Sequence, residues 1–163
     1  SKATPNRTIP ESRISQDVEY LKTIMARSDN GDTPALIRRE MGEEMNDHVA
    51  VFRTNSGLEK AREKLKELNN RYANVPVQDK GNIFNTNIIF MLELGFMLDC
   101  AETIVAGALE RKESRGAHYR ADHPQRDDDN WLRHVLVTRT ETGSAVSYQP
   151  VTITQWQPQV RSY

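Results

Sequence analysis

The chain has 163 residues, of which 37% are hydrophobic and 28% are charged, and its formal net charge is -1. This length and composition are typical of one globular domain with its own core. Because acidic and basic residues are interspersed and nearly balanced, there is no electrostatic basis for binding nucleic acid or an anionic membrane surface. The single cysteine, Cys100, excludes a disulfide within the chain and weakly favours a reducing compartment.

The polar N-terminal residues and the most apolar run of the chain give two further expectations. The polar start, Ser-Lys-Ala-Thr-Pro, lacks an initiator methionine, so we expect a processed chain or a piece of a longer protein. Residues 88–98 are almost wholly apolar but contain Glu93. This run is shorter than the ~20 apolar residues that cross a bilayer. We therefore expect a buried helix there, no direct membrane insertion, and a chain that is soluble by itself.

The first third of the chain predicts two helices. Val18, Leu21 and Ile24 recur at helical spacing, and Ser15 is the expected N-cap of this helix. After a turn at residues 28–32, Thr33 is expected to cap a second helix, in which Pro34 suits the first position because proline has no amide hydrogen. The apolar stripe of the second helix comprises Ile37, Met41, Met45, His48, Val49 and Phe52.

Two longer helices follow. The residues from Ser56 to Glu59 fit a capping box, in which each side chain accepts a hydrogen bond from a free amide of the first turn. The third helix is expected to end near Pro76. A fourth helix is predicted from about Asn85 to about Arg111. The apolar positions of the third helix are Leu58, Ala61, Leu65, Leu68 and Tyr72.

The last third of the chain differs from the rest, because the helical period disappears after Ser114. Residues 133–140 and 145–149 predict two strands joined by a turn. An isolated hairpin is marginal in water, so this tail must pack on the helices or on another domain. We therefore predict a mainly α fold, with a helical bundle over residues 1–114 and an extended loop and hairpin tail over residues 115–163.

No motif for catalysis is present. The sequence contains no glycine-rich phosphate loop, no nucleophile elbow and no H-E-x-x-H zinc motif. Cys100 lies in a predicted helix, so we expect it to be buried and structural. His48 and His134 are expected to be core histidines with hydrogen-bond partners rather than catalytic bases.

The densest polar cluster lies between the fourth helix and the strands, and it leaves three interpretations open. Histidine and aspartate are metal ligands, but the spacing of His118 and His123 matches no common zinc pattern. The aspartates could instead cap the turn before Trp131 in a solvated loop. Alternatively, the arginines could make forked hydrogen bonds to carboxylates on a neighbouring domain. The cluster comprises Arg115, His118, Arg120, Asp122, His123, Arg126 and residues 127–129.

This cluster also carries a family resemblance. The run from Glu113 to Trp131 reads ESRGAHYRADHPQRDDDNW and resembles a motif near the end of succinate dehydrogenase and fumarate reductase flavoprotein subunits. The run from Met41 to Arg53, MGEEMNDHVAVFR, is similar to the helix of that family that ends in H-V-G-V-F-R. The long helix NIIFMLELGFMLDC and the C-terminal QPVTITQWQPQVRSY also resemble the family. The resemblance covers nearly the whole chain from about residue 10.

The resemblance implies an architecture and a setting. The fold would be a spectrin-repeat-like three-helix bundle with an additional N-terminal helix, followed by an extended segment that packs on an FAD-binding domain of the same subunit. The full subunit would bind FAD, interconvert succinate and fumarate, and pass electrons to an iron–sulfur subunit. Membrane anchor subunits would hold the pair at the cytoplasmic face of the bacterial inner membrane.

The resemblance implies no chemistry for this chain alone. None of the active-site residues of the family maps onto these positions, so we expect no catalytic, cofactor-binding or metal-binding residue here. Arg115, His118, Arg120 and Arg126 are expected to dock against another domain. If so, the loop arginines should lack partners within the chain. The alternatives are the C-terminal domain of L-aspartate oxidase and a free-standing helical protein-interaction module.

Overall fold

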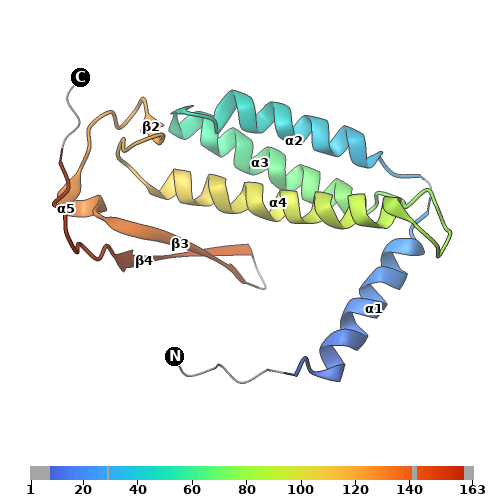
Figure 1. The fold of residues 1–163 in the computed structure, drawn as a ribbon. Coiled ribbons are helices and arrows are strands. Elements are labelled where there is room, and N and C mark those ends of the chain that lie inside the picture. The colour runs from blue at the N-terminus through green and yellow to red at the C-terminus, as the bar shows by residue number, and fades with distance from the viewer. Residues whose placement is uncertain (1–7, 29, 141–142, 160–163) are drawn as a thin grey trace.

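The computed structural model describes residues 8–28, 30–140 and 143–159. Three helices lie side by side and form a bundle: α2 (Pro34–His48), α3 (Asn55–Tyr72) and α4 (Thr86–Glu110), as Figure 1 shows. The predicted mainly α fold, a three-helix bundle with an additional N-terminal helix, is confirmed. Among the described residues, no helix is both long enough and apolar enough to cross a membrane.

Helix α1 (Glu11–Met25) points away from the bundle (Figure 1). The expected cap at Ser15 is wrong, because the helix begins four positions earlier, directly after Pro10. Ile24, in the last turn, is the buried residue of α1. Arg27 connects the end of α1 to the bundle. Its guanidinium donates to the carbonyls of Tyr72 at 3.0 Å and Val75 at 3.3 Å.

Helix α2 begins as predicted and ends earlier than predicted. The hydroxyl of Thr33 accepts a hydrogen bond from the amide of Leu36 at 3.2 Å, and Pro34 occupies the first helical position. The helix stops at His48, so Phe52 does not belong to its apolar stripe. Phe52 is instead 77% exposed. It lies in strand β1 (Phe52–Arg53).

The N-cap of α3 also differs from the prediction. Thr54, rather than Ser56, caps the helix, and its hydroxyl accepts from the amide of Gly57 at 3.1 Å. Two capping residues stand two positions apart in this segment, and sequence alone does not rank them. The apolar stripe is confirmed by the buried residues Leu58, Ala61, Leu65 and Leu68.

Helix α4 has the bounds that the sequence indicated. Asn85 caps it by accepting from the amide of Ile88 at 3.2 Å, while its amide group donates to the carbonyls of Asp79 at 2.7 Å and Gly81 at 2.8 Å. The absence of a side chain at Gly95 lets Tyr72 of α3 approach closely, since a Cβ there would lie 2.7 Å from its hydroxyl. The buried face of α4 comprises Met91, Leu94, Leu98, Ala101, Val105 and Ala108.

The tail is attached to the bundle by two small β structures. Strand β2 (Tyr119–Arg120) pairs in parallel with β1. Short α5 (Asp128–Trp131) leads into an antiparallel hairpin of β3 (Arg133–Thr140) and β4 (Gly143–Pro150), which confirms the two predicted strands. The hairpin contacts α4 (Figure 1). Arg139 of β3 donates to Asp99 of α4 at 2.8 Å.

We predict that Asn85→Ala lowers the free energy of unfolding by about 1–2 kcal/mol, because it removes the cap of α4 and two hydrogen bonds to the preceding loop. Urea unfolding followed by circular dichroism measures the change. Asn46→Ala is the matched control, since Asn46 is an exposed position of α2. A loss no larger than that of the control would contradict the capping role of Asn85.

Candidate functional site

The polar loop that follows α4 folds back onto the bundle. A tight turn forms at Gly116, which has a positive φ of 58°, and brings the backbones of Arg115 and His118 together through two hydrogen bonds of 2.8 and 3.0 Å. The amide of Ala121 then donates to the carbonyl of Arg53 at 2.8 Å. The loop is therefore tied to the segment between α2 and α3.

Arg120 is fully buried and binds the C-terminal end of α4. Its Nη1 donates to the carbonyls of Ala108 at 2.9 Å, Leu109 at 3.3 Å and Arg111 at 3.3 Å. The last carbonyls of a helix lack intrahelical partners and carry partial negative charge, so a guanidinium there is favourable. Arg120 thus acts as the C-terminal cap of α4.

The charge of Arg120 is balanced by Asp122. Two parallel hydrogen bonds of 2.9 and 2.8 Å join Nε and Nη2 of Arg120 to the carboxylate, which also accepts from the amide of Asn55 at 3.1 Å. The Arg120 guanidinium holds the pKa of Asp122 well below its usual range. Because Asn55 is the first residue of α3, this pair fastens the end of α4 to the beginning of α3.

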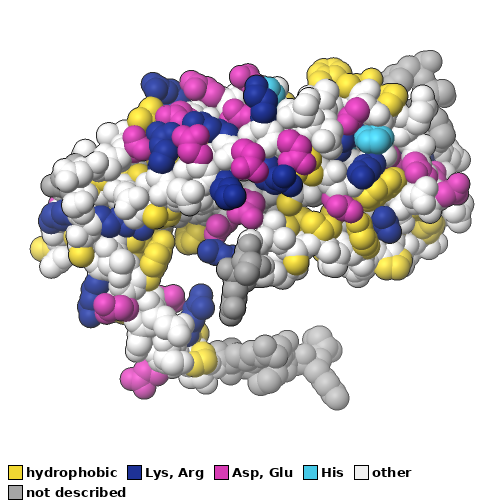
Figure 2. All heavy atoms as spheres, turned by 180° about the vertical axis from the view of Figure 1, so that it is seen from behind, with side chains coloured by type: hydrophobic (Ala, Val, Ile, Leu, Met, Phe, Trp, Pro, Cys, Tyr) yellow, Lys and Arg dark blue, Asp and Glu magenta, His cyan; other side chains and the backbone are white. Residues whose placement is uncertain are grey.

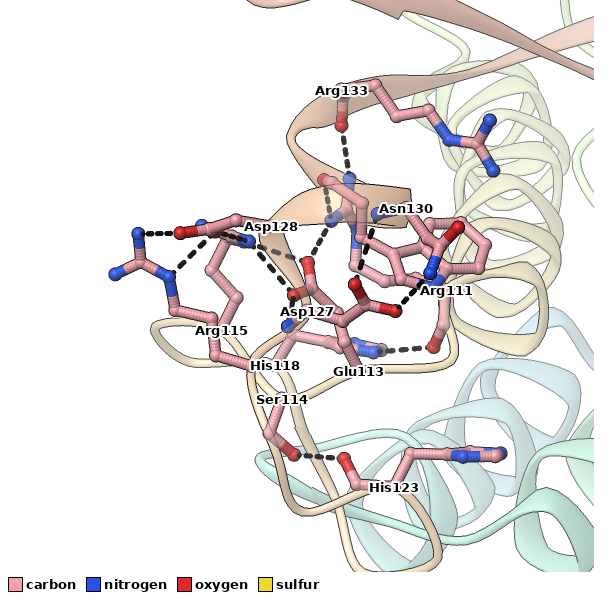
Figure 3. A network of polar contacts seen from close by, with 12 residues as sticks. Arg111, Glu113, Ser114, Arg115, His118, His123, Asp127, Asp128, Asn130 and Arg133 are labelled. Atoms are coloured by element: carbon pink, nitrogen blue, oxygen red, sulfur yellow. Dashed lines mark hydrogen bonds and ion pairs between the residues drawn. The ribbon is translucent and has the colours of Figure 1, made fainter. Parts of the chain in front are cut away.

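Glu113 is a second buried charge. Figure 3 shows the groups around it: Arg111, Arg115 and the backbone of Asp127. Arg115 donates to both carboxylate oxygens at 2.8 and 2.9 Å, and the amide of Asp127 donates at 2.9 Å. Arg111 also donates to Glu113. Burial opposes ionisation of Glu113, but these donors outweigh it and lower its pKa.

The aspartates organise the start of the hairpin. Asp127 caps α5 by accepting from the amide of Asn130 at 3.0 Å. Asp128 accepts from Arg126 at 2.8 and 2.6 Å and from Arg115 at 2.5 Å, and these two arginines lower the pKa of Asp128 to about 2. The interpretation of the aspartates as capping residues is therefore confirmed for Asp127.

His118 is held in one tautomer by its neighbours. Its Nδ1 lies 2.7 Å from Nη1 of Arg53, and a guanidinium can only donate, so Nδ1 accepts. Nε2 then carries the proton and donates to the carbonyl of Arg111 at 3.1 Å. Burial lowers the pKa of His118, and the positive charges of Arg53, Arg120 and Arg111 lower it further, against the effect of the hydrogen bond to the carbonyl. The ring is thus a neutral bridge between Arg53 of β1 and the C-terminal end of α4.

These contacts decide part of the sequence-based interpretation. The expectation that the loop arginines lack partners within the chain is wrong: Arg115, Arg120 and Arg126 each pair with a carboxylate of the same chain. Their docking against another domain stays a prediction. Within the described residues, no group of three or more His, Cys, Asp or Glu side chains is arranged to hold a metal ion.

Three further side chains lie differently from the expectation. Cys100 is exposed on α4 rather than buried, and His134 is exposed on β3 rather than in the core. His48 is partly buried, with Nε2 at 3.7 Å from Glu44. Glu113 and Arg53 also belong to the network, although no sequence pattern assigned them to it. The only sequence feature that could have predicted an ion pair for Glu113 is its position directly before an arginine-rich turn.

The family of the chain follows from comparison with known proteins. Residues 38–163 match the family described as fumarate reductase flavoprotein C-term. The chain belongs to this family. The chain is 39% identical over 149 residues to the fumarate reductase flavoprotein subunit of Haemophilus influenzae, a match that covers 91% of this chain and 25% of that protein. It is 36% identical over 154 residues to the succinate dehydrogenase flavoprotein subunit of Rickettsia conorii, covering 93% of this chain and 26% of that protein.

Solved structures agree with this assignment. A quinol–fumarate reductase with menaquinol molecules superposes with a TM-score of 0.87 at 35% identity, over 96% of this chain and 28% of that chain. The E. coli quinol fumarate reductase gives 0.85 at 34% identity, over 96% and 28%. The chain therefore corresponds to the C-terminal domain of such flavoprotein subunits and spans about a quarter of the length of its curated relatives.

We predict that Arg120→Met destabilises the chain by about 3 kcal/mol, because it leaves Asp122 unpaired and uncaps α4. Urea unfolding measures the loss. Arg126→Met is the matched control and should cost much less stability than Arg120→Met, since Asp128, the partner of Arg126, is 40% exposed and solvent screens the pair. Equal losses for the two variants would contradict the special position of Arg120.

The neutral state of His118 predicts a pH dependence. Because the folded pKa of His118 lies below its ordinary value of 6.5, the unfolded chain binds more protons as the pH falls below that value, and the free energy of unfolding decreases. We expect His118→Asn, whose side-chain oxygen can still accept from Arg53, to lose less stability between about pH 7 and pH 5.5 than the parent chain. His134→Asn, at an exposed strand position, should keep the parental pH dependence. An unchanged profile in His118→Asn would refute the assignment.

Proposed function

We propose that this chain is the part of a flavoprotein subunit that supports an FAD-binding domain, while the chemistry takes place outside the chain. The whole subunit would carry FAD and interconvert succinate and fumarate. It would pass electrons to an iron–sulfur subunit, and membrane anchor subunits would hold the pair at the cytoplasmic face of the inner membrane. The support comes from family membership, from relatives named as fumarate reductase and succinate dehydrogenase flavoprotein subunits, and from the surface of the bundle.

The observation that carries the proposal is an apolar face on α4 that the described residues leave open. Ile89, Phe96, Cys100 and Ile104 recur at spacings of seven, four and four, so they share one side of the helix. Phe96 is 63% exposed, and Ile89 and Ile104 are about half exposed. Contiguous exposed apolar side chains of this kind are typical of a surface that another domain covers.

Two neighbouring segments extend this unpartnered surface. Helix α1 stands apart from the bundle in Figure 2, and its apolar residues Ile14 and Val18 are exposed. In the loop before α4, Phe84 is 96% exposed and has a positive φ of 51°, a conformation that costs energy for a bulky residue. A relative that is about four times as long as this chain has ample further sequence to cover such a surface.

The hairpin tail has the same property. All the residues of β4 are exposed, and Trp156 beyond it is 85% exposed. We assign the bundle to residues 1–114 and the docking tail to residues 115–163. In the complete subunit the tail would lie between the bundle and the FAD-binding domain. Arg115, His118, Arg120 and Arg126 would then shape this tail from within.

The test uses the full-length product of the same gene. We predict that the full-length protein binds flavin and converts succinate to fumarate, and that Phe96→Asp reduces its flavin content several-fold because the charge disrupts the covered face. Absorbance at the flavin bands, per mole of protein, measures the effect. Lys60→Asp, at an exposed position of α3, is the matched control and should retain flavin.

Two results would count against the proposal. A full-length product without flavin would refute the assignment of the subunit's function. Full flavin content in the Phe96→Asp variant would refute the covering of the α4 face. In the latter case the alternative hypothesis, a free-standing helical protein-interaction module, would explain the exposed α4 face better.

A further inference from the structure

Arg53 is a cation without an ion-pair partner among the described residues. Its Nε donates to the carbonyl of Val49 at 2.8 Å, and its Nη1 donates to His118 at 2.7 Å. Both acceptors are neutral. Burial and the nearby charge of Arg120 lower the pKa of Arg53, and no carboxylate among the described residues offsets these two effects. A partly buried guanidinium normally has a carboxylate nearby, because burying an unpaired charge is costly.

The other described arginines without a carboxylate lie in different surroundings. Arg27 is held by two backbone carbonyls. Arg38 is exposed to solvent. Arg133 stacks over the ring of Tyr148 at 3.7 Å from its centroid, a favourable cation–π contact. Arg53 differs from Arg27 and Arg38 because it is partly buried and has a second guanidinium nearby, that of Arg120.

Arg53 also lines a surface depression of about 600 Å³. The depression lies where α4, the hairpin and the β1–β2 pair meet. Arg111, His118 and His134 line it as well, and no Asp or Glu does. Arg111 is already paired with Glu113. The uncompensated positive charge of the depression therefore resides on Arg53.

Part of the wall of the depression is apolar. Ile104 of α4 and Leu136 of β3 contribute to it and are 50% and 41% exposed. A free small anion would neutralise Arg53 but would leave these side chains in water. An acidic side chain on a protein segment would do both, because its methylene groups and the flanking residues could cover the walls.

A carboxylate fits the charge of this site. The fork of a guanidinium matches the two oxygens of a carboxylate, and one uncompensated positive charge balances one carboxylate. We propose that Arg53 receives an Asp or Glu side chain from the part of the flavoprotein subunit that lies outside this chain. The inference rests on the proposed function, since it names the charged contact of the same interdomain surface. It adds Arg53 to the predicted contacts of the loop arginines with another domain.

The first experiment tests the site in the 163-residue chain itself. Sodium acetate is titrated against sodium chloride at constant ionic strength, and the Nε–H signals of the arginines are followed by NMR. We expect the Arg53 signal to shift saturably, with a dissociation constant on the order of millimolar. Arg53→Lys should weaken the binding about tenfold or more, because it removes the fork. Arg38, which is exposed and has no ion-pair partner among the described residues, is the control and should not saturate. Absence of saturation at Arg53 would overturn the proposal.

The second experiment asks where the carboxylate comes from. Phenylglyoxal modifies accessible guanidinium groups, and peptide mass analysis locates the modified arginines. In the 163-residue chain Arg53 should react, and acetate should protect it. In the flavin-containing full-length product Arg53 should be protected without acetate, while Arg38 reacts in both. Equal reactivity of Arg53 in the two proteins would overturn the proposal and leave the flavoprotein assignment intact. A full-length product without flavin would instead refute that assignment, while the acetate titration still reports on the site.

Discussion

The buried guanidinium of Arg120 fixes the arrangement of this domain. It caps the last carbonyls of α4, and through Asp122 it reaches the first amide of α3. A buried cation is tolerated because helix carbonyls and a bidentate carboxylate surround it. The β1–β2 pair and the turn at Gly116 follow from this anchor, since Arg120 is itself a residue of β2. The hairpin then leaves the bundle from a fixed point beside α4.

The pairing of charges within the chain distinguishes the polar loop from the exposed apolar surface of α4. The loop holds several arginines and aspartates, but their ion pairs lie within the chain, so they stabilise the fold and leave little charge for a partner. The surface that we propose another domain covers includes exposed apolar side chains on α4, α1 and the hairpin. Arg53 adds one uncompensated positive charge to it. An apolar surface with one charged contact provides both affinity and orientation.

The sequence predicted the fold better than it predicted the partners of polar side chains. Thr33 and Asn85 were identifiable as caps because each stands directly before a periodic apolar run. Ser56 was assigned wrongly because Thr54, two positions earlier, is an equally suitable cap, and Ser15 because α1 begins directly after Pro10 without a side-chain cap. Cys100 lies on an apolar helix, and helical periodicity alone does not tell which apolar side faces the bundle. Each loop arginine pairs with a carboxylate two positions away, a spacing that helical periodicity does not bring together, so the helix rules did not predict these pairs.

Native-state hydrogen exchange tests the anchoring role of Arg120 most directly. The amides of Ala121 and Asn55 donate to Arg53 and Asp122 respectively, so both report on the loop while it is fastened. If the loop is part of the folded core, these two amides exchange only in the global unfolding reaction, with the same free energy as the core amides of α3 and α4. Exchange at the rate of an unstructured peptide, while α3 and α4 remain protected, would show that the loop detaches freely and would contradict the account.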